Sequence, residues 1–272
     1  SSTPGSSTAV VIGDSITIDS RMLGETRRIN IYKPAMYDKD SSRYPVLYMS
    51  DGGAEEDFHH ITGIVQVSVM NGTMRPFLVV GIENTVRRRD LTGPTENPED
   101  LVRTATPKVG GSALFRRFIR EELMPEIRKH YRTTAETAIV GESLGGLFAL
   151  ETFFLDPDLF DTYVSVSPSL WWNNQSIARN AAARLKKYGN RKKTLFIAKE
   201  RDEDSGDGAK ILADALREVA PPGLTWHYAP MPEEGHGTIF HGAALKAFRT
   251  VFAPPPEPTP AAGTSPTGVG TH

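Results

Sequence analysis

The stretch TAIVGESLGGLFALE (residues 137–151) decides the fold. An apolar run (138–140) meets Gly141-Glu142-Ser143-Leu144-Gly145, and a helical pattern starts directly after it. The pattern G-x-S-x-G between a β run and a helix is typical of a nucleophile elbow, in which a serine sits on a strained turn. The residues two places before and after that serine must be small. A tight glycine-rich turn whose serine has no catalytic role can have the same sequence, so the rest of the chain must separate the two interpretations.

Strand and helix patterns alternate on both sides of this stretch. Short β-rich runs cover residues 16–20, 27–34, 44–50, 77–84, 137–143, 162–168, 193–200 and 224–232. Helical spacing of apolar residues covers 112–131, the segment after 206 and the segment that ends at 252. Most of the β-rich runs are apolar nearly throughout, as in strands buried on both faces of a parallel sheet. The alternation predicts an α/β protein with helices on both faces of one mostly parallel sheet of about eight strands.

The composition excludes several classes of protein and of site. The chain has 272 residues, a net charge of −2 and no cysteine. A charge so close to zero gives no field that would attract nucleic acid, and no apolar run approaches the roughly 20 residues that span a bilayer. The absence of cysteine removes disulfides, thiolate metal sites and a cysteine nucleophile. We expect a small-molecule substrate, no nucleic acid and no membrane span, while the oligomeric state is left open.

Three segments are expected along the chain: a flexible N-terminal segment (1–8), one catalytic domain (9–252) and a flexible tail (253–272). The tail is rich in Pro, Thr and Gly and has too few large apolar groups to offset the entropy of ordering. The opening SSTPGSST is neither a signal peptide nor an initiator methionine, and cytoplasmic and exported locations are both compatible with it. The one long stretch without a pattern, about 85–110, is expected to be a functional loop.

A serine nucleophile needs a base, and seven histidines are available. In hydrolases with a nucleophile elbow the base comes last along the chain, behind the acid. His236 has that place, in MPEEGHGTIF between the last β run and the last helical pattern. His241 opens the last helix and is a poorer alternative, whereas His227 falls inside the predicted strand. We therefore expect His236 to be the general base.

The acid that orients the base is expected on the loop after the run 193–200. This loop reads KERDEDSGDG (199–208) and carries five carboxylates, most of which suit a solvated acidic turn. Glu200 leaves the predicted strand directly and ranks first, and Asp202 ranks second. The oxyanion hole requires two backbone N–H donors. We expect Leu144, directly after the nucleophile, and Gly53, in a loop (51–54) where glycines let the backbone approach a substrate.

Two further loops follow predicted strands and carry candidates for substrate binding, because ligands bind at the carboxyl ends of the strands in this architecture. Trp171 and Trp172 could form an apolar wall for an aromatic or acyl group, with core packing as the alternative. The arginines of ENTVRRRD, Arg87 and Arg89 among them, could meet an anionic or catecholate group, with Asp90 fixing one of them. The alternative is that they are solvated loop charges. No phosphate loop, metal-ligand spacing or dinucleotide fingerprint appears, so we expect no metal and no cofactor.

Five blocks of the chain resemble the "Putative esterase" family of α/β-hydrolases. These blocks are RYPVLYMSDGG, FLVVGIENTVRRRDLTGP, VGESLGGLFALE, DTYVSVSPSLWWNN and MPEEGHGTIFHGAALKAF. They occur in the family's order, the resemblance covers about residues 15–252, and the nearest branch contains bacterial siderophore esterases of the enterobactin-hydrolase type. The resemblance implies an α/β-hydrolase fold and a Ser-His-based ester hydrolase, with Ser143 as nucleophile, His236 as base, and Gly53 and Leu144 as oxyanion donors. Relatives commonly carry His where Glu142 stands, and the acid is poorly fixed in the family, some members working as a Ser-His dyad.

These features together predict a serine carboxylic-ester hydrolase that forms an acyl-enzyme on Ser143, acting on siderophore-like, aryl or short-acyl esters. An acyltransferase of the mycolyltransferase type is the alternative among enzymes, because the sequence does not fix whether water or an alcohol takes the acyl group. A serine peptidase is disfavoured, because no separate propeller or lid domain fits in this length. A non-catalytic binding protein on a hydrolase scaffold is disfavoured by the presence of both Ser143 and His236.

Overall fold

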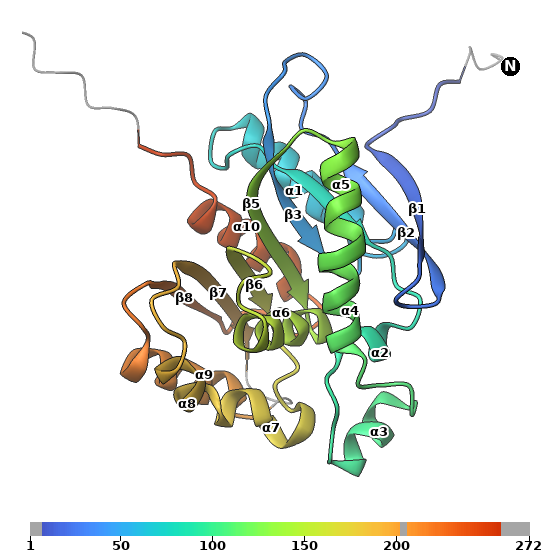
Figure 1. Cartoon of the computed structure of the whole chain (residues 1–272). Helices are drawn as coiled ribbons and strands as arrows, with labels where there is room; N and C mark the ends of the chain where they lie inside the picture. The colour runs from blue at the N-terminus through green and yellow to red at the C-terminus, as the bar shows by residue number, and fades with distance from the viewer. Residues whose placement is uncertain (1–6, 202–205, 257–272) are drawn as a thin grey trace, which may run out of the picture.

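A computed structural model describes residues 7–201 and 206–256 of the chain. Its centre is one eight-stranded sheet that contains all eight predicted strands (Figure 1). The strands are β1 (Asp14–Ser20), β2 (Glu25–Tyr32), β3 (Tyr44–Met49), β4 (Leu78–Ile82), β5 (Thr133–Glu142), β6 (Thr162–Val166), β7 (Lys193–Glu200) and β8 (Leu224–Met231). The expected flexible ends, 1–8 and 253–272, lie mostly outside the described residues.

The sheet is parallel except at one strand. Its order is β1-β2-β4-β3-β5-β6-β7-β8, and every neighbouring pair from β4 to β8 is parallel. β2 runs antiparallel to both of its neighbours, and a tight turn through Gly24 (φ 66°) joins it to β1. Glycine accepts this left-handed angle without steric cost. The carboxyl ends of β3 to β8 therefore lie along one edge of the sheet, which is where the predicted site residues fall.

Helices cover both faces of the sheet and give each face its own core. One face carries α1 (Phe58–Met70) and α10 (Ile239–Val251), and the other carries α4 (Ser112–Phe118), α5 (Met124–His130), α6 (Leu144–Leu155), α8 (Ala181–Lys186) and α9 (Gly208–Val219) (Figure 1). Strand β5 shows why its sequence is apolar throughout. Ala138 and Val140 pack in the core of α1 and α10, while Ile139 packs in the core of α6. A central strand alternates its side chains between two buried faces.

The predicted helix over 112–131 is interrupted by a π-helical turn, η1 (Ile119–Leu123), between α4 and α5. Pro125 explains the interruption, because it has no N–H to donate to the carbonyl four residues earlier and its ring would clash with that carbonyl. The N–H of Met124 donates instead to Ile119 O, five residues back. A π turn of this kind absorbs one extra residue and widens the helix locally.

The stretch 85–110, predicted to be a loop without a pattern, contains two short helices, α2 (Arg87–Leu91) and α3 (Pro98–Thr104). Helix α3 starts with a recognisable signal: Asn97 is the cap, its side chain accepts the N–H of Glu99 at 3.1 Å, and Pro98 follows at the first helical position. Within 7–201 and 206–256, no helix is long and apolar enough to cross a membrane.

Candidate active site

Ser143 occupies the sharp turn between β5 and α6. Its backbone angles (φ 59°, ψ −117°) are in a region that residues other than glycine rarely adopt. The flanking glycines are required by close packing in this turn. A Cβ on Gly141 would lie 2.4 Å from the carbonyl carbon of Gly145, and a Cβ on Gly145 would lie 2.3 Å from Ser50 Oγ. The turn therefore has the geometry that the G-x-S-x-G pattern predicts.

His236 lies beside this serine, on the loop between β8 and α10. Its Nε2 is 3.1 Å from Ser143 Oγ, a hydrogen-bond distance. In the neutral ring Nε2 can accept the hydroxyl proton if Nδ1 carries the other hydrogen. The alternative, His241, lies in α10, where its ring is 5.5 Å from that of His60. His227 lies in β8 with its ring near Phe196.

Two groups face the other nitrogen of His236. Glu200, the last residue of β7, places Oε1 3.5 Å from Nδ1. Ser167 Oγ is closer to Nδ1, at 2.7 Å. Lys199 Nζ lies 2.7 Å from Glu200 Oε1, and both side chains are buried. Asp202, the second-ranked acid, lies outside the described residues. Glu200, the first-ranked acid, is the described carboxylate that faces Nδ1 of His236.

The carboxylate and the imidazole shift one another's ionisation. Burial alone would raise the pKa of Glu200, but its interactions with His236, Lys199 and Ser167 outweigh burial and hold the pKa well below its usual range. The same contact with Glu200 raises the pKa of His236, against burial, which lowers it, and the charge of Glu142 raises it further. Glu200 is thus ionised and stabilises the protonated imidazole.

Glu142, the residue before the serine, is a second carboxylate at the base. Its Oε1 lies 3.4 Å from His236 Nε2, the nitrogen that also faces Ser143. Burial raises the pKa of Glu142 to about 7, although the positive charges of His236 and Arg87 act to lower it. The negative charges of Asp51 and Asp57 add to the upward shift. His236 therefore has one carboxylate at each ring nitrogen, and the carboxylate at Nε2 changes its charge near neutral pH.

A cavity of about 440 Å³ opens over these residues. Its lining includes Ser143, Leu144, Ser167, Ser169, Glu200 and His236, together with Trp171 and the arginines Arg87, Arg88, Arg103 and Arg201. The guanidinium of Arg103 lies 4.1 Å from the centre of a Trp171 ring. Arg87 is paired with Asp51, at 2.5 Å from Nε to Oδ1. Among the residues that the structure describes, the lining holds four arginines and one carboxylate, Glu200, and of these arginines Arg87 alone forms an ion pair.

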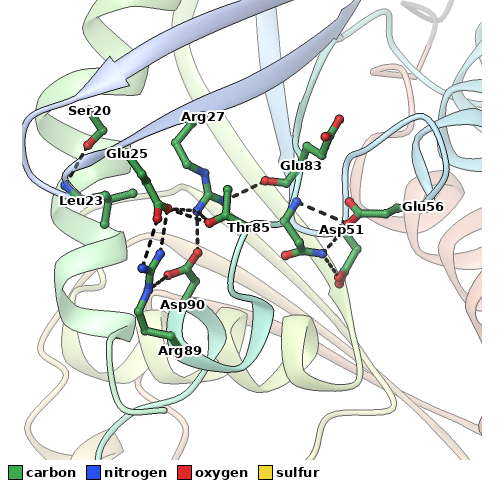
Figure 2. A network of polar contacts seen from close by, with 11 residues as sticks. Ser20, Leu23, Glu25, Arg27, Asp51, Glu56, Glu83, Thr85, Arg89 and Asp90 are labelled. Atoms are coloured by element: carbon green, nitrogen blue, oxygen red, sulfur yellow. Dashed lines mark hydrogen bonds and ion pairs between the residues drawn. The ribbon is translucent and has the colours of Figure 1, made fainter. Parts of the chain in front are cut away.

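Three of the predicted site residues lie elsewhere. Arg89 donates to Glu25 and Asp90, and Figure 2 shows it turned toward these carboxylates and the buried Arg27. Asp90 does fix an arginine, as expected, but Arg89 is thereby held in a structural network outside the cavity lining. This network fastens α2 to β2, since Arg27 also reaches Asp90 at 2.6 Å.

Trp172 is 2% exposed, and its indole N–H donates to Gly93 O at 3.0 Å, so Trp172 is a core residue rather than part of the cavity wall. The N–H of Gly53 donates to Glu56 Oε2 at 2.7 Å, and Gly53 does not line the cavity. Glu56 also accepts from Asn84, so the amide of Gly53 is held in a local network rather than directed at the site. Leu144, by contrast, does line the cavity.

Sequence reasoning missed two serines and two arginines of this site. Ser167 and Ser169 belong to SPSLWWNN, a loop that follows β6, and Ser169 Oγ is 3.3 Å from Ser143 Oγ. Their position at the carboxyl end of a strand was the signal that could have identified them. Arg103 and Arg201 come from α3 and from the end of β7, and no local pattern marks them. No group of three side chains suited to a metal ion occurs among residues 7–201 and 206–256.

Residues 20–221 of the chain match the model of the family described as "Putative esterase". The chain is 30% identical over 259 residues to the ferri-bacillibactin esterase BesA of Bacillus subtilis (strain 168), covering 87% of this chain and 88% of that protein. It is similar in structure to an IroE-like serine hydrolase of Shewanella oneidensis, with 31% identity, a TM-score of 0.79, and coverage of 88% of this chain and 80% of that one. A Bacillus cereus protein titled BES is similar too, with 26% identity, a TM-score of 0.79, and coverage of 91% and 98%.

These similarities extend over nearly the whole described chain and confirm the predicted α/β-hydrolase fold. The family match stops at residue 221, before β8 and His236, whereas the similarities in structure cover about nine-tenths of the chain. By its sequence, its fold and its relatives, the chain belongs to the "Putative esterase" family and is a siderophore-esterase-like esterase.

Proposed function

We propose that this esterase is a serine carboxylic-ester hydrolase in which Ser143 is the nucleophile and His236 the general base. The observation that carries the proposal is the 3.1 Å separation of Ser143 Oγ and His236 Nε2 in the wall of an open cavity. Nε2 takes the hydroxyl proton as Oγ attacks the ester carbonyl, and then gives that proton to the departing alkoxide. Water attacks the acyl group left on Ser143, and its proton passes through His236 as the acid is released.

Leu144 N–H is our candidate for one oxyanion donor. Leu144 is the first residue of α6, so its N–H has no partner within the helix, and the helix N-terminus favours negative charge there. The second donor is not Gly53 while Glu56 holds that amide.

Hydrolysis, rather than acyl transfer, is favoured by the exposure of the base. The side chain of His236 is 56% exposed, and the cavity is open to solvent. An acyltransferase has to keep water away from its acyl-enzyme, because water competes with the acceptor alcohol. We infer that water reaches the acyl group on Ser143 readily.

The substrate class follows from the charge of the cavity. Arg88, Arg103 and Arg201 line the cavity and form no ion pair with the carboxylates of residues 7–201 and 206–256, and Trp171 offers an aromatic face under Arg103. This lining suits esters whose acyl group is anionic and aromatic. Several relatives carry names of siderophore esterases, among them the ferri-bacillibactin esterase and an iron(III) salmochelin esterase of Escherichia coli. We therefore propose siderophore esters as the substrates of this enzyme.

A set of matched esters tests this function. The set has a trilactone siderophore with and without iron, an anionic aryl ester, and a neutral aryl ester with the same leaving group. We expect the trilactone and the anionic ester to have the highest kcat/KM, and Ser143→Ala to lower every rate by roughly 10³-fold or more. Ser42→Ala, at an exposed loop serine, is the control. An organophosphate should label Ser143 alone, and full activity in Ser143→Ala would overturn the proposal.

A further inference from the structure

His236 has a hydroxyl closer than a carboxylate at the nitrogen that faces away from Ser143. Ser167 Oγ lies 2.7 Å from Nδ1, whereas Glu200 Oε1 lies 3.5 Å away. The first distance is that of a good hydrogen bond, and the second exceeds the usual range for N–H···O bonds. Because Nε2 must be free to accept the proton of Ser143, Nδ1 carries the ring hydrogen and donates it to Ser167.

Ser167 is held in place tightly. It is 2% exposed, and its own N–H donates to Ala198 O at 2.8 Å, which fastens the end of β6 to β7. Its φ of 44° lies in the left-handed region, where residues with a side chain are rare. Backbone outliers of this kind cluster at functional sites, where the surroundings enforce them. Here the outlier directs a buried hydroxyl at the base.

Glu200 lies on the same side of the imidazole as this hydroxyl, because Glu200 Oε1 and Ser167 Oγ both face Nδ1 of His236, at 3.5 Å and 2.7 Å. Glu200 is 8% exposed, and an interaction with Ser167 is among those that keep its pKa low. A serine hydroxyl has one hydrogen to donate and two lone pairs to accept with. If Ser167 accepts from His236, its hydrogen is free to go to the ionised carboxylate of Glu200. A chain His236–Ser167–Glu200 then gives both hydrogens, that of Nδ1 and that of the hydroxyl, an acceptor.

We propose that Ser167 is a positioning residue of the active site, whose hydroxyl accepts the Nδ1–H of His236 and donates to Glu200. The carboxylate then acts on the base through this hydroxyl. This inference rests on the proposed function, because it requires His236 to be the base. The hydroxyl fixes the tautomer and the orientation of the imidazole, and the negative charge behind it stabilises the imidazolium that forms during attack on the ester.

The backbone angle of Ser167 allows a clean test. Ser167→Gly removes the hydroxyl and at the same time relieves the left-handed strain, whereas Ser167→Ala removes the hydroxyl alone. We expect both to lower kcat by about 10- to 100-fold, the range for a hydrogen bond to a charged group. KM should stay within about threefold of its original value, since the hydroxyl is directed at His236 and is 2.7 Å from its Nδ1. The acidic limb of the pH profile of kcat/KM should move to lower pH, because the imidazolium has lost an acceptor.

Thermal unfolding and a matched control separate this role from a structural one. Ser167→Gly should melt no lower than Ser167→Ala, so a rate lost in both variants is not lost through unfolding. Ser165→Ala removes another buried hydroxyl, on the strand β6 that Ser167 follows, which donates to Gly146 O at 2.9 Å. That variant should leave the pH profile in place.

A double-mutant cycle with Glu200→Gln gives the decisive result. If Glu200 acts through Ser167, the double variant should be no slower than the slower single variant, since both substitutions interrupt the same series of hydrogen bonds from His236 to Glu200. Losses that multiply would show that Glu200 acts on His236 directly and would overturn the proposal. Unchanged kcat in Ser167→Gly would overturn it too. Full activity in Ser143→Ala would instead count against the proposed function.

Discussion

Replacing Glu142 by glutamine removes a negative charge next to His236, the proposed base, and keeps the shape of the side chain. The charge lies 3.4 Å from His236 Nε2, where it stabilises the imidazolium. A water-like dielectric suits the half-exposed His236 and sets the lower limit of the interaction at about 1.2 kcal/mol, which the burial of Glu142 increases. At 1.36 kcal/mol for each pH unit, the variant should lower the pKa of His236 by at least roughly 0.9. The base then stays neutral at lower pH.

The assay is kcat/KM for a neutral chromogenic ester between about pH 5 and 9, in which only the enzyme titrates. We expect the acidic limb of Glu142→Gln to lie at least about one pH unit lower than in the original enzyme. The limb of the original enzyme should be broader, because burial raises the pKa of Glu142 to about 7 and the two groups titrate together. Glu136→Gln, on the same strand but paired with Arg75, is the control. A limb that stays in place, or moves upward, would refute the reasoning.

The same substitution should change stability with a definite sign. The folded-state pKa of Glu142 is raised from 4.5 to about 7, so the folded protein binds the proton more tightly than the unfolded chain does. Its contribution is present in full below about pH 4.5 and is lost as the pH rises through 7. Glutamine does not ionise, and we expect Glu142→Gln to exceed the original chain in free energy of unfolding at pH 8 by up to about 3 kcal/mol, the shift from 4.5 to about 7 at 1.36 kcal/mol for each pH unit. Near pH 4 the gain should be absent, as urea unfolding at the two pH values would show.

Three other substitutions have distinct expected outcomes. Trp172→Ala should lower the free energy of unfolding by about 3–5 kcal/mol, because a buried indole and its hydrogen bond are lost. Trp171→Ala should lower the melting temperature less than Trp172→Ala does and should raise KM, because Trp171 is only partly buried and lines the cavity; equal melting temperatures for the two variants would contradict this assignment. Arg103→Ala should raise KM for an anionic ester by roughly fivefold, an effect of about 1 kcal/mol that high salt weakens, while KM for a neutral ester stays the same. Gly141→Ala should abolish esterase activity, because its Cβ would lie 2.4 Å from the backbone of Gly145, and circular dichroism should show whether the sheet survives.

The sheet and its elbow were predictable from the sequence because their causes are local. The central strands are apolar because both faces of the sheet are buried, and the turn requires Gly141 and Gly145 for steric reasons. The strands and the elbow can therefore each be recognised from residues that are close together in the sequence. The π turn of the 112–131 segment was not predicted, although Pro125 marks it. Helix α3 was missed for the opposite reason: its capping signal is clear, but it is too short for a periodic pattern.

The side chains around the base were harder to predict, because adjacent residues point in different directions. Trp171 lines the cavity and Trp172 fills the core, yet both have the same neighbours in sequence. Arg87 and Arg89, two places apart on α2, reach different carboxylates for the same reason. Ser167 meets His236 only through the pairing of β6 with β7 and the loop after β8, and contacts of that kind are set by tertiary structure.

The four side chains proposed to act together, Ser143, His236, Ser167 and Glu200, lie at the ends of four neighbouring strands. Ser143 follows β5, Ser167 follows β6, Glu200 ends β7 and His236 follows β8, and these strands are adjacent in the sheet in the same order. The last of them, β8, is at the edge of the sheet and pairs with β7 alone among the described strands. Edge elements open locally at a lower free energy than the centre of a sheet. Detachment of β8 would carry His236 away while the other three groups stayed together, so mild denaturant should abolish turnover before the far-ultraviolet signal of the sheet changes. The rate of ester hydrolysis should therefore depend on whether β8 is paired with the rest of the sheet.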